Sequence, residues 1–304
     1  MKDYDLIDIE SKIYSDLSDS CIMDQEATDF IDKNLEQAPE FGEETISEIY
    51  ENLTLFTDTI TSHPEQDSAE FLKHVQSVIK NVNLMSIKEG YYNSFLARFT
   101  YVFTFKSGKM LSRHQKNLQQ LEKFHAGIFD ARANVQTLFL SMHAFLTSYI
   151  HLLEKVDRKI VLGKCIIEKL RNEKKQKDKV SAKTVMKQRV FALELEKNIP
   201  MQIITGLHVI EGLYNEYFTI FDEQLYPNFT QFVQKYRQNI CARLQQMKNP
   251  KLKEHLRAFE EQELEELFSF YHQILSALSS LIIIDEDLKE KISDMQEQVN
   301  YLNK

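Results

Sequence analysis

The chain has 304 residues and a formal net charge of −9, and 43% of its residues are apolar, which is enough for a large core and excludes wholesale disorder. It holds only 7 glycines and 5 prolines; because β architectures need these residues at their turns, the composition argues against a sheet-rich fold. The three cysteines, Cys21, Cys165 and Cys241, are odd in number and far apart, which excludes a disulfide framework and a CxxC metal site.

Residues 1–42 form an acidic arm. Residues 1–50 carry a net charge of −12, whereas the rest of the chain carries +3. Between residues 7 and 35 the apolar pattern is short and broken, which predicts short helices or partial disorder, and the acidic beginning lacks the apolar stretch of a signal peptide. Such an arm either keeps the protein soluble or occupies a basic groove on its own body or on a partner.

Residues 43–108 predict a subdomain of short helices. Apolar residues recur every three or four positions from about Glu44, which indicates a helix that His63-Pro64 should end, because the residue before proline disfavours helical backbone. A second helix should cover Phe71 to Val82, with a cap at Asp67-Ser68.

The aromatic stretch from Tyr91 to Lys109 fits a strand, an apolar helix or a loop, and Ser107-Gly108 should end it. From about Leu111 to Arg171 apolar residues keep a spacing of three or four without an intervening proline, which predicts one long helix. A polar, basic hinge over 172–180 should follow.

A second long helix should run from about Ala182 to Met247, bent at Pro200 and broken near Tyr226-Pro227, because an internal proline removes a helical hydrogen bond. After Asn249-Pro250 a third should reach the C-terminus. Its tail has a heptad pattern typical of a coiled coil, formed by Leu281, Leu288, Met295 and Leu302, with Ile292 and Val299 at the second seam position. Polar residues interrupt Leu267 to Ile284, which favours a buried helix over a membrane span.

These elements predict an all-α fold, an elongated antiparallel bundle of long helices over 109–304 preceded by the short-helix subdomain. Motifs for chemistry are absent from the sequence: it has no phosphate-binding GxxxxGK[ST], no HExxH and no G-x-S-x-G. One ExxH pair, Glu122 and His125, has no second copy of the kind di-iron bundles need, and His143 and His151 fit polar helix positions better than a metal site. We therefore expect no catalytic, cofactor-binding or metal-binding residues.

A lysine-rich cluster surrounds the predicted hinge, and residues 164–189 carry a net charge of +7. It suits anionic lipid, oxyanions or the acidic arm, or is a solvated hinge; with few arginines and no interleaved aromatics, it does not favour nucleic acid. The candidate binding residues are Lys164, Lys169, Arg171, Lys174, Lys175, Lys177, Lys179 and Lys183.

The segment RVFALELEKNIPMQ, residues 189–202, resembles the central signature of the TelA-like toxic anion (tellurite) resistance family. Arg189, Leu193, Leu195 and Gln202 keep the register of that signature, and an apolar pair follows at Val209-Ile210. The Asn-rich run and the Trp of the family are missing here. The resemblance, over about residues 45–240, implies a cytoplasmic, non-enzymatic helical protein of tellurite and envelope-stress resistance.

We therefore expect a stress-resistance protein that acts through association with a protein partner, as a homo-oligomer, or by peripheral contact with anionic membrane. The alternative is a crescent-shaped scaffold dimer, like a BAR domain, that binds membranes or partner helices.

Overall fold

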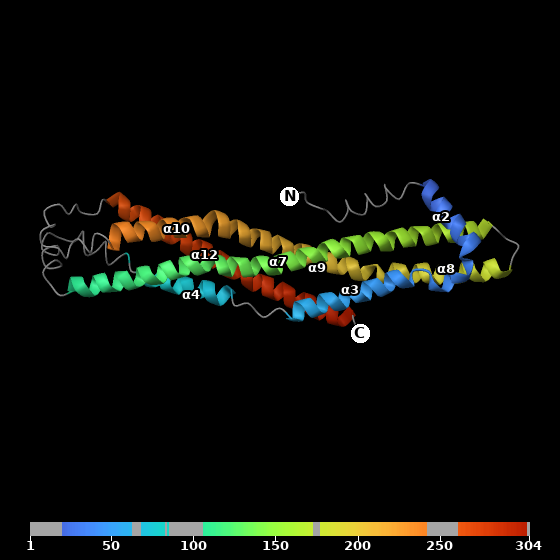
Figure 1. Cartoon of the computed structure of the whole chain (residues 1–304), viewed down its shortest axis with the longest axis horizontal. Coiled ribbons are helices and arrows are strands. Elements are labelled where there is room, and N and C mark those ends of the chain that lie inside the picture. Colours follow the sequence, from blue (N-terminus) through green and yellow to red (C-terminus); the bar gives the residue numbers. More distant parts are fainter. Residues whose placement is uncertain are drawn as a thin grey trace. The chain divides into compact units, whose positions relative to one another are not determined.

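The computed structural model describes residues 20–62, 68–82, 84, 106–172, 177–241 and 261–302 (Figure 1). Nearly all of these residues are helical, and none of them lies in a β-strand. The all-α prediction is confirmed. Contacts divide the chain into two compact units, of which unit 1 holds residues 1–64, 140–210 and 291–304, and unit 2 holds residues 65–139 and 211–290.

Unit 1 is built from short helices at the N-terminus and parts of longer ones. The short elements are α2 (Ser20–Lys33), the 3₁₀ turn η1 (Leu35–Glu40) and α3 (Glu43–Ser62). The longer ones are the second half of α7 (Lys106–Asn172), α8 (Lys177–Glu196), the first half of α9 (Asn198–Thr219) and the last turns of α12 (Glu261–Leu302). Apolar side chains from every one of these elements are buried, among them Ala27, Leu53, Val156, Leu193, Ile203 and Val299.

Unit 2 combines α4 (Ser68–Asn81) with the first half of α7, the end of α9 and most of α12. It also holds α10 (Tyr226–Lys235) between two π-helical turns, η2 (Ile220–Leu225) and η3 (Tyr236–Cys241). Its core is aromatic, because Tyr217, Phe221, Phe229 and Phe232 are all fully buried.

The helices predicted in the first part of the chain follow the apolar spacing. The predicted helices near 44–62 and 71–82 are α3 and α4, and the long helix expected over 111–171 is α7. Two boundaries were predicted too late: α7 begins at Lys106, so Gly108 lies inside it, and α8 begins at Lys177, within the expected hinge. Because both starts are polar, apolar periodicity gave no signal there.

The predicted interruptions at the two prolines differ from those in the structure, because the helix is broken near Pro200 rather than bent and continues through Pro227. Pro200 lies in the first turn of α9, after a single turn residue, Lys197, and a proline there gives up no helical hydrogen bond. The predicted break near Tyr226-Pro227 is wrong, since η2 leads directly into α10. A π turn changes the hydrogen-bond register just ahead of the proline, whose ring has no N–H to donate.

Several predictions lie outside the described residues, namely those on 1–19, on most of Tyr91–Lys109 and on 242–260. At the start of α4, the Ser68 hydroxyl donates to the Asp285 carboxylate of α12, whereas Asp67, the other expected cap residue, is not described.

Four of the six predicted heptad positions of α12 are buried, whereas Ile292 and Leu302 are half-buried. Leu281, Leu288, Met295 and Val299 are buried in their own units, and Met295 lies directly against Gly206 of α9. A coiled-coil tail beyond these contacts stays a prediction. Among the described helices, α12 is long and apolar enough to cross a membrane by length and composition alone, and 39% of its most apolar stretch is buried. The core helix of a soluble protein passes the same test.

Candidate functional site

The lysine-rich cluster is partly engaged by acidic residues of unit 1. The Lys164 ammonium lies 2.7 Å from a Glu194 carboxylate oxygen. Lys169 contacts α2 at three points: the Asp24 carboxylate at 2.9 Å, the Asp24 carbonyl at 2.8 Å and the Thr28 hydroxyl at 2.6 Å. These two lysines therefore help to hold neighbouring helices on α7.

The other predicted cluster residues are not gathered around one point. Arg171 is exposed at the end of α7, whereas Lys179 and Lys183 are half-buried on α8. Lys174, Lys175 and the Lys177 side chain lie outside the described residues. The structure thus brings Lys164 and Lys169 into contact with acidic groups and shows no shared ligand pocket for the described members.

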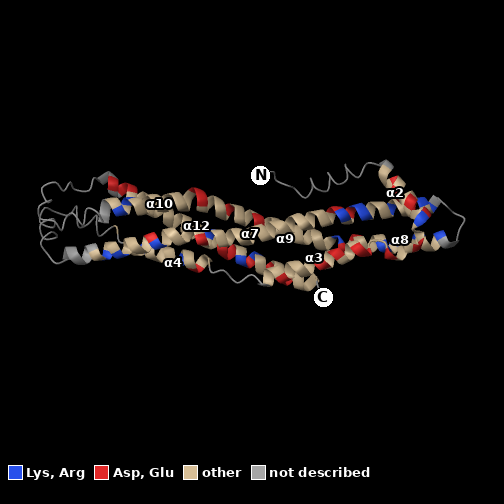
Figure 2. Cartoon of the chain, viewed as in Figure 1, with Lys and Arg blue, Asp and Glu red and all other residues tan. Residues whose placement is uncertain are grey.

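A row of ion pairs joins the N-terminal helices to the body of unit 1, and its Lys169–Asp24 member fits the predicted alternative in which the acidic arm docks on the lysine-rich cluster. Figure 2 marks the acidic and basic residues along these helices. Arg158 lies 2.7 Å from Glu26, Lys155 pairs with Glu48, and Arg189 lies 3.2 Å from Glu43. Together with Lys169–Asp24 these pairs form what we call the acidic latch. Each exposed pair contributes about 0.2–1 kcal/mol at most. The opposite net charges of arm and body predicted that the two could meet, but gave no signal for the partners Arg158, Lys155 and Arg189.

Two residues of the family-like signature hold α8 to the beginning of α3. The Arg189 guanidinium donates from Nε to the Phe41 carbonyl at 3.0 Å and also meets Glu43. Leu193 is fully buried and packs against Gly42, where an added Cβ would lie 2.7 Å from Leu193 Cδ1. Their role in this structure is packing and positioning.

The other two signature residues face outward. The Gln202 side chain is exposed, and its Oε1 accepts a hydrogen bond from Gln298 Nε2 of α12 at 3.1 Å. Leu195 keeps 54% of its surface exposed. The signature therefore combines packing residues with one exposed leucine that packing does not explain.

Leu195 belongs to an apolar face of α8. Val180 and Phe191 are also exposed, at 59% and 61%, and their spacing from Leu195 places all three on one side of the helix, with Thr184 between them. We call Val180, Thr184, Phe191 and Leu195 the α8 row. The opposite side of α8 is buried in unit 1 through Met186, Val190 and Leu193. Burial of large apolar side chains is favourable, and these three exposed side chains lie on one side of α8, so the row is a candidate binding face.

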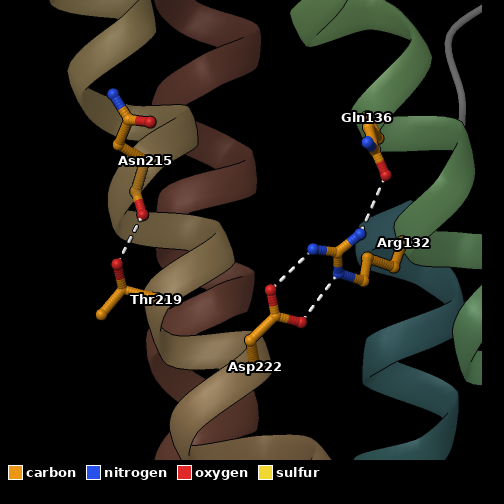
Figure 3. A network of polar contacts seen from close by, with 5 residues as sticks. All are labelled: Arg132, Gln136, Asn215, Thr219 and Asp222. Carbon is orange, nitrogen blue, oxygen red and sulfur yellow. Dashed lines mark hydrogen bonds and ion pairs between the residues drawn. The ribbon is translucent and has the colours of Figure 1, made fainter. Parts of the chain in front are cut away.

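In unit 2 the polar groups mainly join helices. Arg132 of α7 forks onto both Asp222 carboxylate oxygens, with Nε and Nη2 at 2.8 and 2.6 Å, and donates to Gln136 (Figure 3). Its guanidinium also lies 5.0 Å from the centre of the Phe218 ring. Such bidentate, stacked arginine contacts position α9 and η2 against α7.

The ExxH pair is engaged by its neighbours. Glu122 pairs with Arg237, and His125 Nε2 lies 2.9 Å from the Thr230 hydroxyl. Burial lowers the pKa of His125, which favours its neutral form. His151 lies 3.2 Å from Glu154 and, like His143, is exposed. Among the described residues, no three histidine, cysteine or acidic side chains are placed to share a metal ion.

The Cys165 thiol is half-buried in unit 1, and burial, followed by Asp24 and Glu168, raises its pKa. A raised pKa keeps sulfur in its unreactive thiol form. This sulfur is therefore poorly suited to reducing an oxyanion.

Unit 2 has a cleft of about 260 Å³ at the end of α4. It is lined by Lys80, Asn81, Val82, Leu84, Arg113, Phe268 and Tyr271. The two cations favour an anion, but the carbonyl end of α4 disfavours one at the same place, because a helix is partially negative at its C-terminus. The cleft therefore assigns no ligand class.

Searches for a matching protein-family model, curated protein or solved structure find none. The resemblance to the toxic anion resistance family stays a prediction that depends on the signature residues.

Proposed function

We propose that the chain is a non-enzymatic helical protein of toxic-anion resistance that acts by binding a protein partner through the α8 row. The observation that carries this proposal is the exposure of Val180, Phe191 and Leu195 on one face of α8, between 54% and 61% each. Leu195 belongs both to this face and to the family-like signature, which links the resemblance to the binding surface.

The acidic latch also supports this proposal. It holds α2 and α3 against α7 and α8, so that the buried side of α8 is occupied and its outer face remains for a partner. Phe191 supplies the aromatic side chain that is enriched at protein interfaces, and Val180 and Leu195 add apolar surface around it.

A growth assay tests this proposal. Cells that express the chain should tolerate more tellurite than cells with an empty vector, and the double substitution Phe191→Glu with Leu195→Glu should remove the gain. The matched control is Leu55→Glu on α3, an equally exposed leucine at 58% in the same unit. Equal tolerance with both variants at equal protein level, or no gain with the wild type, would contradict the proposal.

A second candidate is peripheral binding to anionic membrane as a scaffold. The observation that favours it is that Arg158 and Lys169 form ion pairs with acidic residues of α2 that are exposed on one or both sides. Exposed ion pairs exchange partners at low cost, so an anionic surface can replace them.

A further inference from the structure

The outer face of α8 has a two-fold internal pattern. Val180 and Leu195 lie at equal distances from the point between Lys187 and Gln188, and so do Thr184 and Phe191. Apolar side chains thus mark both ends of the row, at the same spacing from its centre. A face with this pattern can pair with an antiparallel copy of itself, in which each residue meets its counterpart from the other end.

We propose that the α8 row binds a second copy of this chain, through an antiparallel α8–α8 contact centred between Lys187 and Gln188. Val180 then lies opposite Leu195 of the second copy, and Thr184 lies opposite Phe191. The contact is isologous, so each of these pairs occurs twice and the interface closes without growing into a filament. The inference rests on the proposed function and names the partner of the same surface.

Charge argues for this partner and for this direction. Lys183, Lys187 and Glu194 follow one flank of the row, because they are spaced four and seven residues apart. In the antiparallel pair the same flanks meet, so the two Lys187 side chains lie opposite each other at the centre, one like-charge contact against the two Lys183–Glu194 pairs. Lys183 then lies within two residues, or about 3 Å along the axis, of Glu194 of the second copy.

The parallel arrangement lacks this complementarity. A parallel two-fold pair brings opposite flanks together, so Lys183 and Glu194 would face the uncharged flank of Ser181 and Gln188. Charged flanking pairs select direction and partner in paired helices. Glu194 already meets Lys164 in its own chain, but both side chains are exposed, at 41% and 60%, so Glu194 can contact a second cation at little cost.

The contact should be reversible. Helix α8 has 20 residues and is about 30 Å long, and one helix pair of this length covers less area than the roughly 1,200–2,000 Å² of a stable interface. We expect dissociation in the micromolar range or weaker. Sedimentation equilibrium from 5 to about 500 µM, which spans that range, should show a mass that rises from monomer toward dimer.

Substitutions identify the surface. Phe191→Glu should weaken dimerisation at least about tenfold, whereas Leu55→Glu on α3 should leave it unchanged. Lys183→Glu and Glu194→Lys should each weaken it about fivefold, and the two together should restore it, because the charges are then exchanged in both copies. A double variant no better than the single ones would overturn the register, and a wild type that stays monomeric would overturn the dimer. Circular dichroism of each variant checks that the helices are intact.

Cysteine cross-linking tests direction independently. In a background where the three native cysteines are serine, Gln188→Cys lies beside its own counterpart and should form a disulfide-linked dimer. Leu195→Cys should not, because fifteen residue steps separate it from its counterpart, about 22 Å, far beyond disulfide reach. A disulfide-linked dimer that forms in the Leu195→Cys variant but not in the Gln188→Cys variant would overturn the antiparallel arrangement.

The two proposals fail in different ways. If the wild type is monomeric but the row variants still lose tellurite tolerance, the row binds another protein and the second copy is wrong. If the dimer forms and the row variants keep full tolerance, the dimer stands and the proposed action of the α8 row in resistance is wrong.

Discussion

His114 is the clearest case of a single side chain that couples stability to pH. It is 2% exposed in unit 2, and its Nδ1 meets the Tyr236 hydroxyl of η3. Burial, together with the nearby Arg113, lowers the pKa of His114 to about 4. The folded protein therefore holds this ring neutral at pH 7, as the unfolded chain mostly does.

Acid should weaken the fold through this residue. Between pH 6.5 and pH 4 His114 binds a proton in the unfolded chain but stays neutral in the folded chain. The free energy of unfolding therefore falls as the pH falls. We expect a loss of about 1–2 kcal/mol between pH 7 and pH 5 from this group. Urea unfolding at the two pH values measures it.

The control variant is His114→Gln, whose amide side chain is polar and similar in size but does not titrate. Other groups titrate in both proteins, so the informative quantity is the difference in acid sensitivity between them. If the variant loses as much stability as the wild type between pH 7 and pH 5, His114 is not the acid-sensitive group.

At the scale of the elements, the passage from η1 into α3 depends on Gly42. Its φ of +79° lies in the left-handed region, which costs other residues about 1–2 kcal/mol. Its backbone carbonyl accepts the first hydrogen bond of α3, from the Ile46 amide at 3.0 Å. Leu193 of α8 fills the space where a Cβ would be.

Gly42→Ala should therefore lower the free energy of unfolding by about 1–3 kcal/mol, from backbone strain and the displaced Leu193 side chain. Gly212→Ala is the matched control: it lies within α9 with nothing within 4 Å of an added Cβ, so it should raise stability by about 0.5–1 kcal/mol. Urea titrations of both variants measure the two changes. A Gly42→Ala protein as stable as the wild type would show that the turn tolerates a side chain.

The helices were more predictable from the sequence than the contacts between them. Apolar spacing identified α3, α4, α7 and α12, because burial of one face leaves a period of three to four residues. It could not show that Asp157 of α7 would meet Lys197 at the α8–α9 break, 2.9 Å apart and largely buried. The two are 40 positions apart, and helical periodicity says which face is buried without saying what covers it. The α8 row was missed for a related reason, since three apolar residues on a charged helix give only a weak pattern.

At the scale of the whole molecule, the described part of the acidic arm belongs to the core of unit 1. Met23, Ala27 and Ile31 of α2 are buried in unit 1, and Asp24 and Glu26 belong to the acidic latch. Removing residues 1–42 would therefore strip part of the core and would not report on charge alone. Removing residues 1–19 takes away a net charge of −4 and leaves α2 and its contacts in place.

This shorter truncation tests the lysine-rich cluster as a membrane surface. As a hypothesis, the negative field of residues 1–19 opposes binding of the cluster to anionic lipid, since each lysine near such a surface contributes about 1 kcal/mol. The truncated protein should then bind phosphatidylserine vesicles more tightly than the full chain at low salt. Added salt should remove the difference, because the Debye length falls to about 8 Å at physiological ionic strength.

The latch supplies a second variant for the same vesicle assay. Glu26→Gln leaves α2 in place but removes the carboxylate that Arg158 contacts at 2.7 Å, so it should add to the gain from the truncation. Vesicles of neutral lipid are the control and should bind neither protein. Equal binding of the full and truncated chains to anionic vesicles, or none by either, would make the lysines a solvated hinge and the first 19 residues a solubilising tail. A gain that survives high salt would instead indicate an apolar contact, because screening does not remove burial of apolar surface.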